Sequence, residues 1–154
     1  MTKLSWEEVE QIVKSLTVKI KASGFEPDWA IGIAMGGLIP LYFLAKELDI
    51  DNVVTVSASS YNEEGEKGEL VINYLPIIDL SGKKVLLVDE VAETGKTLER
   101  LTEIVRSKYS VKELKTAVLA TNTEKCTFRP DFIGLENNGW IVFPWERRDF
   151  PEYF

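Results

Sequence analysis

The sequence predicts a single α/β domain over residues 1–154, with a mostly parallel central sheet and helices on both faces. Its length, 154 residues, is typical of one domain, and 45% of the residues are hydrophobic, which is enough for a sizeable core. Short runs rich in Val, Ile and Leu alternate with segments of helical spacing. These runs are almost wholly apolar, as expected of parallel strands that are buried on both faces.

The first predicted helix follows Ser5. Ser5 with Glu8 three residues later forms a capping-box pattern, which is typical of a helix start. Apolar residues then recur at helical spacing until Gly24, and they are Trp6, Val9, Ile12, Val13, Leu16 and Ile20. This helix should cover one face of the sheet.

The next segments predict strand, helix and strand. Trp29–Ala34 is a short apolar run, and Leu41–Leu48 continues as a helix with Pro40 in its first turn. Asn52–Ser57 is β-branched and apolar, so it is predicted to be another buried strand. Tyr61–Glu69 combines charged residues with two glycines and is predicted to be a mobile loop.

The second half repeats this alternation. Leu70–Ile78 is predicted to be a strand, or a strand bent at Pro76, and Val85–Val88 to be a central strand. Thr97–Lys108 has apolar residues at helical spacing, and Leu114–Ala120 gives one more apolar strand.

The end of the chain has a different character. Trp140–Phe143 is predicted to be a late edge strand. Phe143–Phe154 is aromatic and charged rather than core-like, so it is expected to form a tail or a lid.

Composition excludes several function classes. The 25 acidic residues exceed 18 Lys and Arg, and the net charge of −7 provides no basic field for a nucleic acid or an anionic membrane. The chain has no His, so acid–base chemistry must use carboxylates, Lys or Tyr. The single cysteine, Cys126, has no partner for an internal disulfide, and no apolar run approaches the roughly 20 residues that span a bilayer. We therefore expect a soluble cytoplasmic protein.

The segment after the central strand carries the candidate chemistry. Asp89 and Glu90 end that strand, and a short loop then delivers Thr94, Gly95, Lys96 and Thr97 at the start of the next helix. Unpaired N–H groups at a helix start, with two hydroxyls, favour a phosphate. Carboxylates accept from sugar hydroxyls and hold the waters of Mg²⁺. The pattern predicts a ligand such as a ribose 5-phosphate; the alternative is that Asp89, Glu90 and Glu93 only cap a helix and solvate a loop.

Two common nucleotide-binding motifs are excluded. Gly95–Thr97 would fit the end of a Walker A loop, but Glu90 stands where that loop needs its first glycine. Gly32, Gly36 and Gly37 do not have the G-x-G-x-x-G spacing of a dinucleotide-binding turn.

Four segments carry a resemblance to a known family. Residues 85–98 (VLLVDEVAETGKTL) resemble the phosphoribosyl-pyrophosphate motif of type I phosphoribosyltransferases, and residues 32–40 (GIAMGGLIP) are similar to the pyrophosphate loop of that family. Ser60–Tyr61 is similar to the dipeptide that opens the family's mobile catalytic loop. Residues 140–146 (WIVFPWE) resemble the purine-covering hood of the compact xanthine-guanine and hypoxanthine enzymes. The resemblance implies the type I phosphoribosyltransferase fold, with a small C-terminal hood over about 121–154.

The resemblance also implies an activity. In this family a purine ring nitrogen attacks C1 of phosphoribosyl pyrophosphate, Mg²⁺ holds the diphosphate, and a nucleoside monophosphate and pyrophosphate leave. The expected substrate is a 6-oxopurine (hypoxanthine, guanine or xanthine), and the expected assembly is a homodimer or homotetramer. Two alternatives stay open, namely an adenine phosphoribosyltransferase on the same scaffold and a non-catalytic sensor of phosphoribosyl pyrophosphate.

Positions that match the family's motifs receive expected roles. The 5′-phosphate would be held by Ala92, Thr94, Gly95, Lys96 and Thr97, and the ribose hydroxyls and hydrated Mg²⁺ by Asp89 and Glu90. The diphosphate would lie along Met35, Gly36 and Gly37. Glu93 would face the purine N7 as the candidate acid–base group, although it could instead be an exposed loop carboxylate.

The remaining roles concern the loop and the base. A loop over 59–69 would close over the reacting centre, with Ser60 at its start and Tyr61 contacting or shielding the diphosphate. Trp140 would stack on the base unless it belongs to the core, and the backbone of Ile141 would contact the exocyclic edge of the purine.

Three departures from the family's pattern bear on specificity. Met35 stands where the purine enzymes often have a basic residue, and Glu90 and Glu93 stand where aspartates are common. Where 6-oxopurine enzymes have a lysine that donates to O6, this chain has Thr121 and Asn122, and the nearest lysine is Lys125. An amide can donate or accept, so from the sequence Asn122 could serve a 6-oxo or a 6-amino purine.

Overall fold

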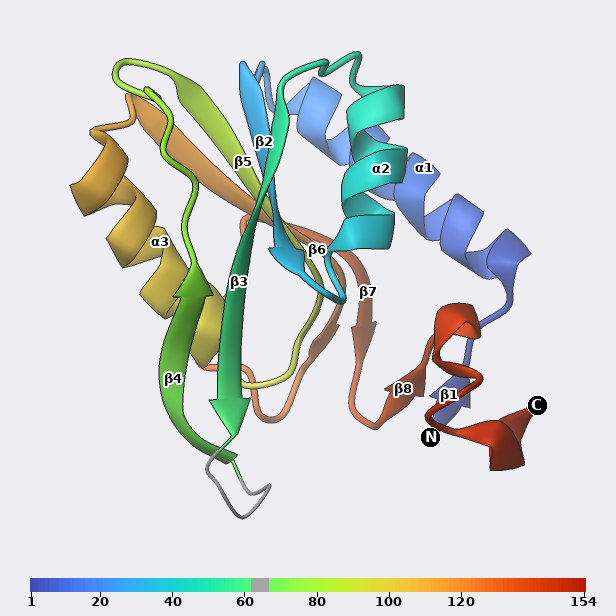
Figure 1. Cartoon of the computed structure of the whole chain (residues 1–154). Coiled ribbons are helices and arrows are strands. Elements are labelled where there is room, and N and C mark those ends of the chain that lie inside the picture. Colours follow the sequence, from blue (N-terminus) through green and yellow to red (C-terminus); the bar gives the residue numbers. More distant parts are fainter. Residues whose placement is uncertain (62–66) are drawn as a thin grey trace.

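A six-stranded sheet forms the centre of the molecule (Figure 1). The computed structural model describes residues 1–61 and 67–154. The strands of this sheet are β2 (Trp29–Ala34), β3 (Val53–Tyr61), β4 (Lys67–Tyr74), β5 (Lys84–Ala92), β6 (Glu113–Asn122) and β7 (Phe132–Asn137). Their order is β4-β3-β2-β5-β6-β7, and only the pairing of β4 with β3 is antiparallel. The prediction of a mostly parallel sheet is confirmed.

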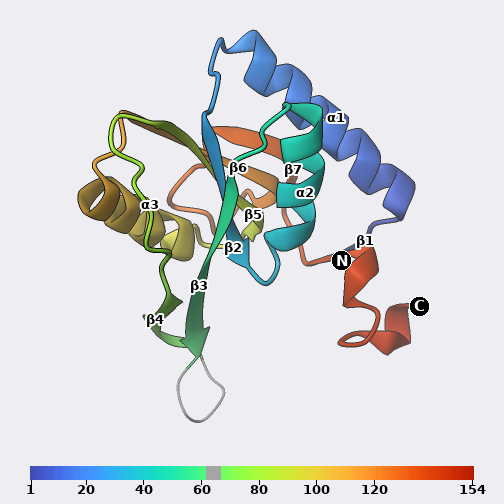
Figure 2. The same ribbon diagram turned by 45° about the horizontal axis from the view of Figure 1, so that its top comes forward.

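Helices cover both faces of this sheet, as predicted (Figure 2). Helices α1 (Trp6–Ala22) and α2 (Leu38–Glu47) lie on one face, and α3 (Lys96–Tyr109) lies on the other. The alternation of side chains along β5 explains this layering, because neighbouring residues of a strand point to opposite faces. Leu86 and Val88 pack in the cluster that contains α1, whereas Val85 and Leu87 pack in the cluster that contains α3.

The start of α1 is set by local side-chain hydrogen bonds. The Glu8 backbone N–H donates to Ser5 Oγ at 3.1 Å, and the Ser5 N–H donates to Glu8 Oε2 at 2.7 Å. The predicted capping box is therefore confirmed, and it satisfies two N–H groups at the helix start.

A second, two-stranded sheet joins the two ends of the described chain. Strand β1 (Thr2–Lys3) pairs in parallel with β8 (Ile141–Val142). The strand predicted over 140–143 is confirmed for Ile141–Val142, but it pairs with the first residues of the chain and not with the main sheet. Two short 3₁₀ helices follow, η1 (Pro144–Glu146) and η2 (Pro151–Tyr153). We call residues 139–154 the C-terminal segment.

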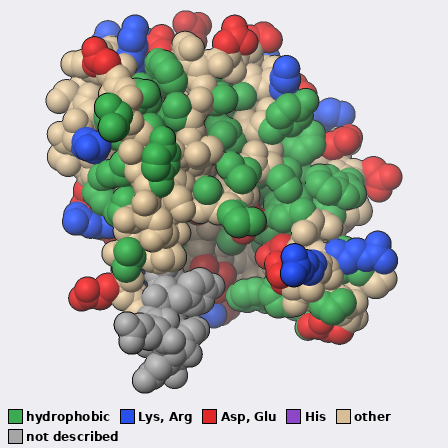
Figure 3. Space-filling view, in the orientation of Figure 1, with side chains coloured by type: hydrophobic (Ala, Val, Ile, Leu, Met, Phe, Trp, Pro, Cys, Tyr) green, Lys and Arg blue, Asp and Glu red, His purple; other side chains and the backbone are tan. Residues whose placement is uncertain are grey.

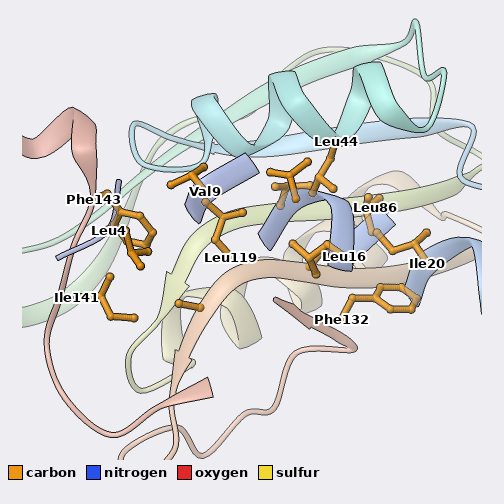
Figure 4. Close-up of a cluster of buried hydrophobic side chains, with 14 of the residues drawn as sticks. Leu4, Val9, Leu16, Ile20, Leu44, Leu86, Leu119, Phe132, Ile141 and Phe143 are labelled. Atoms are coloured by element: carbon orange, nitrogen blue, oxygen red, sulfur yellow. The ribbon is translucent and has the colours of Figure 1, made fainter. Parts of the chain in front are cut away.

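Part of the C-terminal segment is built into the core. Phe143 is only 1% exposed, and it clusters with Leu4 and Ile141 at one end of the main hydrophobic core (Figure 4). This aromatic residue was expected in a tail or a lid, but it anchors the C-terminal segment against α1 and the sheet. Burying a Phe side chain contributes roughly 1.5–3 kcal/mol relative to leaving it in water.

Several strands are longer than predicted. Strand β3 continues through Tyr61 and β4 begins at Lys67, so the ends of the predicted loop 61–69 belong to a hairpin. Pairing with a neighbouring strand stabilises polar residues that would not form a strand alone. Strand β5 likewise continues through Ala92 because it pairs with β6 there. No helix in the described part of the chain is long and apolar enough to cross a membrane.

Candidate active site

The carboxyl ends of the parallel strands meet at one edge of the sheet, beside the C-terminal segment (Figure 1). Ligands of open α/β sheets bind at this edge. Two pockets open there, a small one at the start of α3 and a larger one under the C-terminal segment.

The small pocket has a volume of about 100 Å³ and surrounds the turn between β5 and α3. Its lining residues are Asp89, Val91, Ala92, Glu93, Thr94, Gly95, Thr97 and Leu98. Lys96, also predicted to hold the phosphate, is exposed beside it and contributes its backbone N–H, which lies 3.3 Å from Thr94 Oγ1. We call this hollow the phosphate pocket.

Gly95 shapes the phosphate pocket. Its φ of +81° lies in the left-handed region, and a Cβ there would lie 2.6 Å from the carbonyl oxygen of Phe128. Only glycine fits both requirements. Gly95 is also the N-cap of α3 and has no side chain, so Thr94 Oγ1, which accepts from the Lys96 N–H at 3.3 Å, is the neighbouring side-chain oxygen that a bound anion would displace from the first turn.

Asp89 and Glu90, predicted to end the central strand, lie within β5, which continues to Ala92, so their side chains point to opposite faces. Asp89 lines the phosphate pocket, and Glu90 lines the larger pocket. Burial raises the pKa of Asp89 to about 8, against the opposing effect of the Glu90 backbone N–H at 2.8 Å. Burial also raises the pKa of Glu90 to about 7, against a hydrogen bond from Trp145. Both carboxylates would be stabilised by a nearby cation.

The larger pocket has a volume of about 450 Å³ and lies between the sheet edge and the C-terminal segment. Its lining residues are Glu90, Val91, Glu93, Thr121, Asn122, Gly139, Trp140, Ile141, Phe143, Glu146, Asp149 and Phe150. Trp140 is 52% exposed, which excludes the alternative that it is a core residue. Its ring meets that of Phe150 edge to face, with 5.9 Å between centroids. We call this hollow the aromatic pocket.

Glu93 lines both pockets. Its carboxylate Oε1 lies 3.2 Å from Lys125 Nζ and 3.3 Å from Asn122 Nδ2. Only 24% of the side chain is exposed, so Glu93 is not a fully solvated loop carboxylate. Its position allows it to contact a group that spans the two pockets.

The orientation of the Asn122 amide is fixed by the backbone. Asn122 Oδ1 accepts from the N–H groups of Glu124 and Lys125, each at 3.0 Å. With the oxygen engaged twice, the amide NH₂ is the end that reaches Glu93. Asn122 therefore offers a donor, not an acceptor, at the edge of the aromatic pocket.

Met35, Gly36 and Gly37 form the turn between β2 and α2, and the peptide bond that precedes Met35 is cis. Gly36 touches the Glu90 carboxylate, which a Cβ at this position would overlap. Met35 is 81% exposed at the same turn. The structure thus places Gly36 of this turn beside one of the predicted ribose-binding carboxylates.

The predicted loop residues lie outside this description. The side chains of Ser60 and Tyr61 are not among the described ones, and neither is the segment 62–66. Their predicted roles stay predictions.

Three residues of the aromatic pocket were not among the predicted site residues. Glu146 and Asp149 bring two carboxyl groups, and Phe150 adds a ring beside Trp140. Burial, followed by the charge of Asp149, raises the pKa of Glu146, although the Phe143 backbone N–H opposes this shift. An acidic and aromatic chain end was the only sequence signal, and it did not show which side chains face inward.

The described residues form no cluster of three or more His, Cys, Asp or Glu side chains that would hold a metal ion by themselves. Asp89 and Glu90 nevertheless suit Mg²⁺, which prefers oxygen ligands, keeps several waters and usually takes one or two carboxylates together with substrate phosphates. The donor set thus fits a magnesium ion that is shared with a phosphorylated ligand.

Comparisons with known proteins give one consistent family. The model of the phosphoribosyl transferase domain family matches residues 4–149. A xanthine-guanine phosphoribosyltransferase of Cereibacter sphaeroides is 32% identical, over 93% of this chain and 85% of that enzyme.

Solved structures agree with that match. A purine phosphoribosyltransferase from Pyrococcus horikoshii is 35% identical over 94% of this chain and 92% of its own, with a TM-score of 0.81. A xanthine-guanine-hypoxanthine phosphoribosyltransferase from Helicobacter pylori also has a TM-score of 0.81, covering 99% and 97% of the two chains. It is 23% identical, so this second likeness bears on the fold alone.

Proposed function

Since the chain belongs to the phosphoribosyl transferase domain family, we propose that it is a purine salvage enzyme that acts on 6-oxopurines. It transfers the 5-phosphoribosyl group from phosphoribosyl pyrophosphate to hypoxanthine, guanine or xanthine. The products are a nucleoside monophosphate and pyrophosphate. Relatives with purine and xanthine-guanine phosphoribosyltransferase names support this choice.

The observation that carries the proposal is the position of Glu93 on the wall of both pockets. A ribose 5-phosphate held in the phosphate pocket directs its C1 toward the aromatic pocket, where a purine fits. Holding the two reactants in contact removes much of the entropic cost of their encounter. A carboxylate at the junction can act on the base while the new bond forms.

The residues of the site have distinct roles in this reaction. The N–H groups at the start of α3 and the hydroxyls of Thr94 and Thr97 bind the 5′-phosphate. Asp89 and Glu90 accept hydrogen bonds from the ribose hydroxyls. As N9 of the purine attacks C1 and the C1–O bond to pyrophosphate breaks, Glu93 accepts the proton that leaves N7.

Magnesium is part of the proposal. Asp89 and Glu90 would hold it, directly or through water, and when bound it neutralises the charge of the diphosphate leaving group. The raised pKa values of both carboxyls support this role, because a group whose charge is unfavourable in the free protein gains from a nearby cation.

The fixed amide of Asn122 supports a 6-oxopurine over adenine. Its NH₂ group can donate to a purine O6 but would face the NH₂ group of adenine with no acceptor. Lys125 lies against Glu93, where it offsets the charge of that carboxylate. The adenine alternative is therefore not favoured, and the relatives named as phosphoribosyltransferases do not favour a sensor.

The C-terminal segment supports a role as a hood over the base. Trp140 presents an exposed ring in the aromatic pocket and would stack on the purine, while the Ile141 backbone contacts its edge. Within the proposal, 1–154 is one domain whose hood is supplied by this end of the chain.

We also propose a homodimer or homotetramer in the cytoplasm. Exposed apolar side chains gather on the α2 face (Figure 3), among them Leu38, Tyr42 and Val53. A hollow of about 410 Å³ lies beside three of them. Apolar surface of this kind is typical of subunit contacts. Light scattering of the wild type and of Tyr42→Glu tests this, since a charge at the contact should lower the measured mass.

A base panel tests the function. Purified protein is assayed with phosphoribosyl pyrophosphate, Mg²⁺ and, separately, hypoxanthine, guanine, xanthine, adenine and uracil. Nucleotide should form with 6-oxopurines only, and Glu93→Gln should lower kcat about 100-fold or more. Turnover of adenine alone would show that the protein is an adenine phosphoribosyltransferase instead. Tight binding of phosphoribosyl pyrophosphate without turnover of any base would show that it is a non-catalytic sensor.

A further inference from the structure

A side chain of the C-terminal segment reaches the carboxylate of Glu90. The indole N–H of Trp145 donates to Glu90 Oε2 at 2.9 Å, although the two residues are 55 positions apart in the sequence. Trp145 comes from η1, and Glu90 comes from the central strand β5. The bond therefore links the part of the molecule that covers the base to a carboxylate proposed to bind the ribose.

The opposite side of the same carboxylate is closed by Gly36. A Cβ on Gly36 would overlap Glu90 Oε1 and its carboxyl carbon, so the carboxylate lies directly against the backbone of the turn after β2. The Glu90 carboxylate is thus enclosed between Gly36 and the indole. Two separate parts of the chain limit where its oxygens can point.

Trp145 is itself held in place. Its ring stacks on that of Phe143, with 4.7 Å between centroids and 10° between planes. Its ring also lies beside that of Trp6, with 5.7 Å between centroids. Phe143 is buried in the core. The neighbouring carboxylate of Glu146 already accepts from the Phe143 N–H at 2.8 Å. The indole N–H is therefore fixed by packing and directed at Glu90.

The donor to the Glu90 carboxylate is a neutral indole N–H and not a cationic side chain. Among the side chains that the structure describes, those of residues 1–59 and 68–154, no Lys or Arg is ion-paired with Glu90. A cationic partner would neutralise the carboxylate, whereas a neutral indole orients it and leaves its charge available to ribose hydroxyls or a hydrated cation.

We propose that Trp145 is a positioning residue for phosphoribosyl pyrophosphate, acting by fixing the Glu90 carboxylate against Gly36. The inference rests on the proposed function. The aromatic neighbours of Trp145 alone would indicate only a packing role. In addition to packing, Trp145 orients the Glu90 carboxylate.

The first experiment separates the hydrogen bond from the packing. Trp145→Phe keeps a stacked ring but removes the N–H, and Trp6→Phe is the matched control in the same aromatic cluster. Binding of phosphoribosyl pyrophosphate with Mg²⁺ is measured by calorimetry, and urea unfolding checks that both variants stay folded. Trp145→Phe should bind about 10-fold more weakly, as expected for a lost hydrogen bond to a charged group, while Trp6→Phe should bind within 2-fold of wild type.

A double-mutant cycle tests whether Trp145 acts through Glu90. In a Glu90→Ala background there is no carboxylate to position, so adding Trp145→Phe should weaken binding no further. Additive losses would overturn the proposal, and so would an unchanged affinity in Trp145→Phe. Failure of the wild type to bind phosphoribosyl pyrophosphate would instead refute the proposed function.

A spectroscopic measurement covers the case in which Trp145→Phe folds poorly. The indole N–H signal of Trp145 in a proton–nitrogen NMR spectrum should move in Glu90→Ala, whereas the signal of Trp6 should not. A Trp145 signal that stays in place would show that the hydrogen bond is not formed, and would overturn the proposal.

Discussion

Glu93 and Asn122 share a hydrogen bond, with Asn122 Nδ2 3.3 Å from Glu93 Oε1. Glu93 directly follows β5 and Asn122 is the last residue of β6, and these two strands pair with each other up to Ala92 and Thr121. The proposed acid–base group and the proposed contact to the purine O6 are therefore not independent. A substitution at Asn122 changes the environment of Glu93 as well as the edge of the aromatic pocket.

Asn122→Asp should impair the use of 6-oxopurines. It keeps the size of the side chain but replaces the donor by an acceptor and places a second carboxylate beside Glu93. We expect kcat/KM for hypoxanthine to fall about 100-fold or more, because a site built to donate to a substrate oxygen loses that donor. Steady-state kinetics measure this, with the exposed neighbour Thr123→Ala as control. Undiminished hypoxanthine turnover would show that Asn122 does not contact O6.

Trp140 should control affinity for the base. Trp140→Ala removes the ring that faces the aromatic pocket, and stacking of a base on an aromatic side chain contributes about 1–3 kcal/mol. We therefore expect KM for the purine to rise about 10-fold or more, while KM for phosphoribosyl pyrophosphate changes little. Trp140→Phe, which keeps a flat ring, should recover most of the affinity. Equal losses for both substrates would indicate a structural role instead.

Stability of the ligand-free protein should fall as the pH rises from about 4 to 8. The pKa of Asp89 is raised from 3.8 to about 8, so the folded state keeps a proton that the unfolded state loses. The stabilisation is complete below the unfolded pKa and is lost as the pH passes the folded one. The slope is up to about 1.4 kcal/mol per pH unit for this carboxyl, and Glu90 acts in the same direction up to about pH 7.

Urea unfolding at pH 5, 6, 7 and 8 measures this dependence. Asp89→Asn should flatten the profile, and Glu10→Gln, at an exposed position on α1 away from the site and from the proposed subunit contact, provides the control. A wild-type protein that becomes more stable from pH 5 to pH 8 would contradict the prediction.

Gly95→Ala should damage both stability and phosphate binding. Alanine is strained at a φ of +81°, and its Cβ would meet the Phe128 carbonyl oxygen. We expect a loss of about 1–3 kcal/mol in the free energy of unfolding. Gly82→Ala is a matched control, because Gly82 has a φ of +72° but nothing within 4 Å of the added Cβ. A loss no greater than that of the control would mean that the turn can shift away from Phe128.

Much of this fold could be predicted because its signals are local. The capping box of Ser5 and Glu8 predicts the start of α1, and the apolar run Val85–Val88 predicts the central strand. Strand β7 was missed because Phe132–Asn137 is short and interrupted by Gly134, and it becomes a strand only by pairing with β6.

The site, like the fold, could be predicted from the sequence only where its signals are local. The turn around Gly95 could be found from local sequence, because one short segment supplies the whole helix start. The contact of Trp145 with Glu90 could not, since it depends on the path of the C-terminal segment across the molecule. The fixed orientation of Asn122 likewise depends on the turn that follows it.

The pairing of Thr2–Lys3 with Ile141–Val142 has a consequence for biosynthesis. A growing chain emerges amino end first, so β1 has no partner until most of the protein has been made. Strands β2, β3 and β5 and helix α3 are made earlier, and β5, α3 and the turn between them supply the residues that line the phosphate pocket. The aromatic pocket needs Trp140 and Ile141 and therefore closes last. The residues that line the phosphate pocket therefore emerge before those that complete the aromatic pocket.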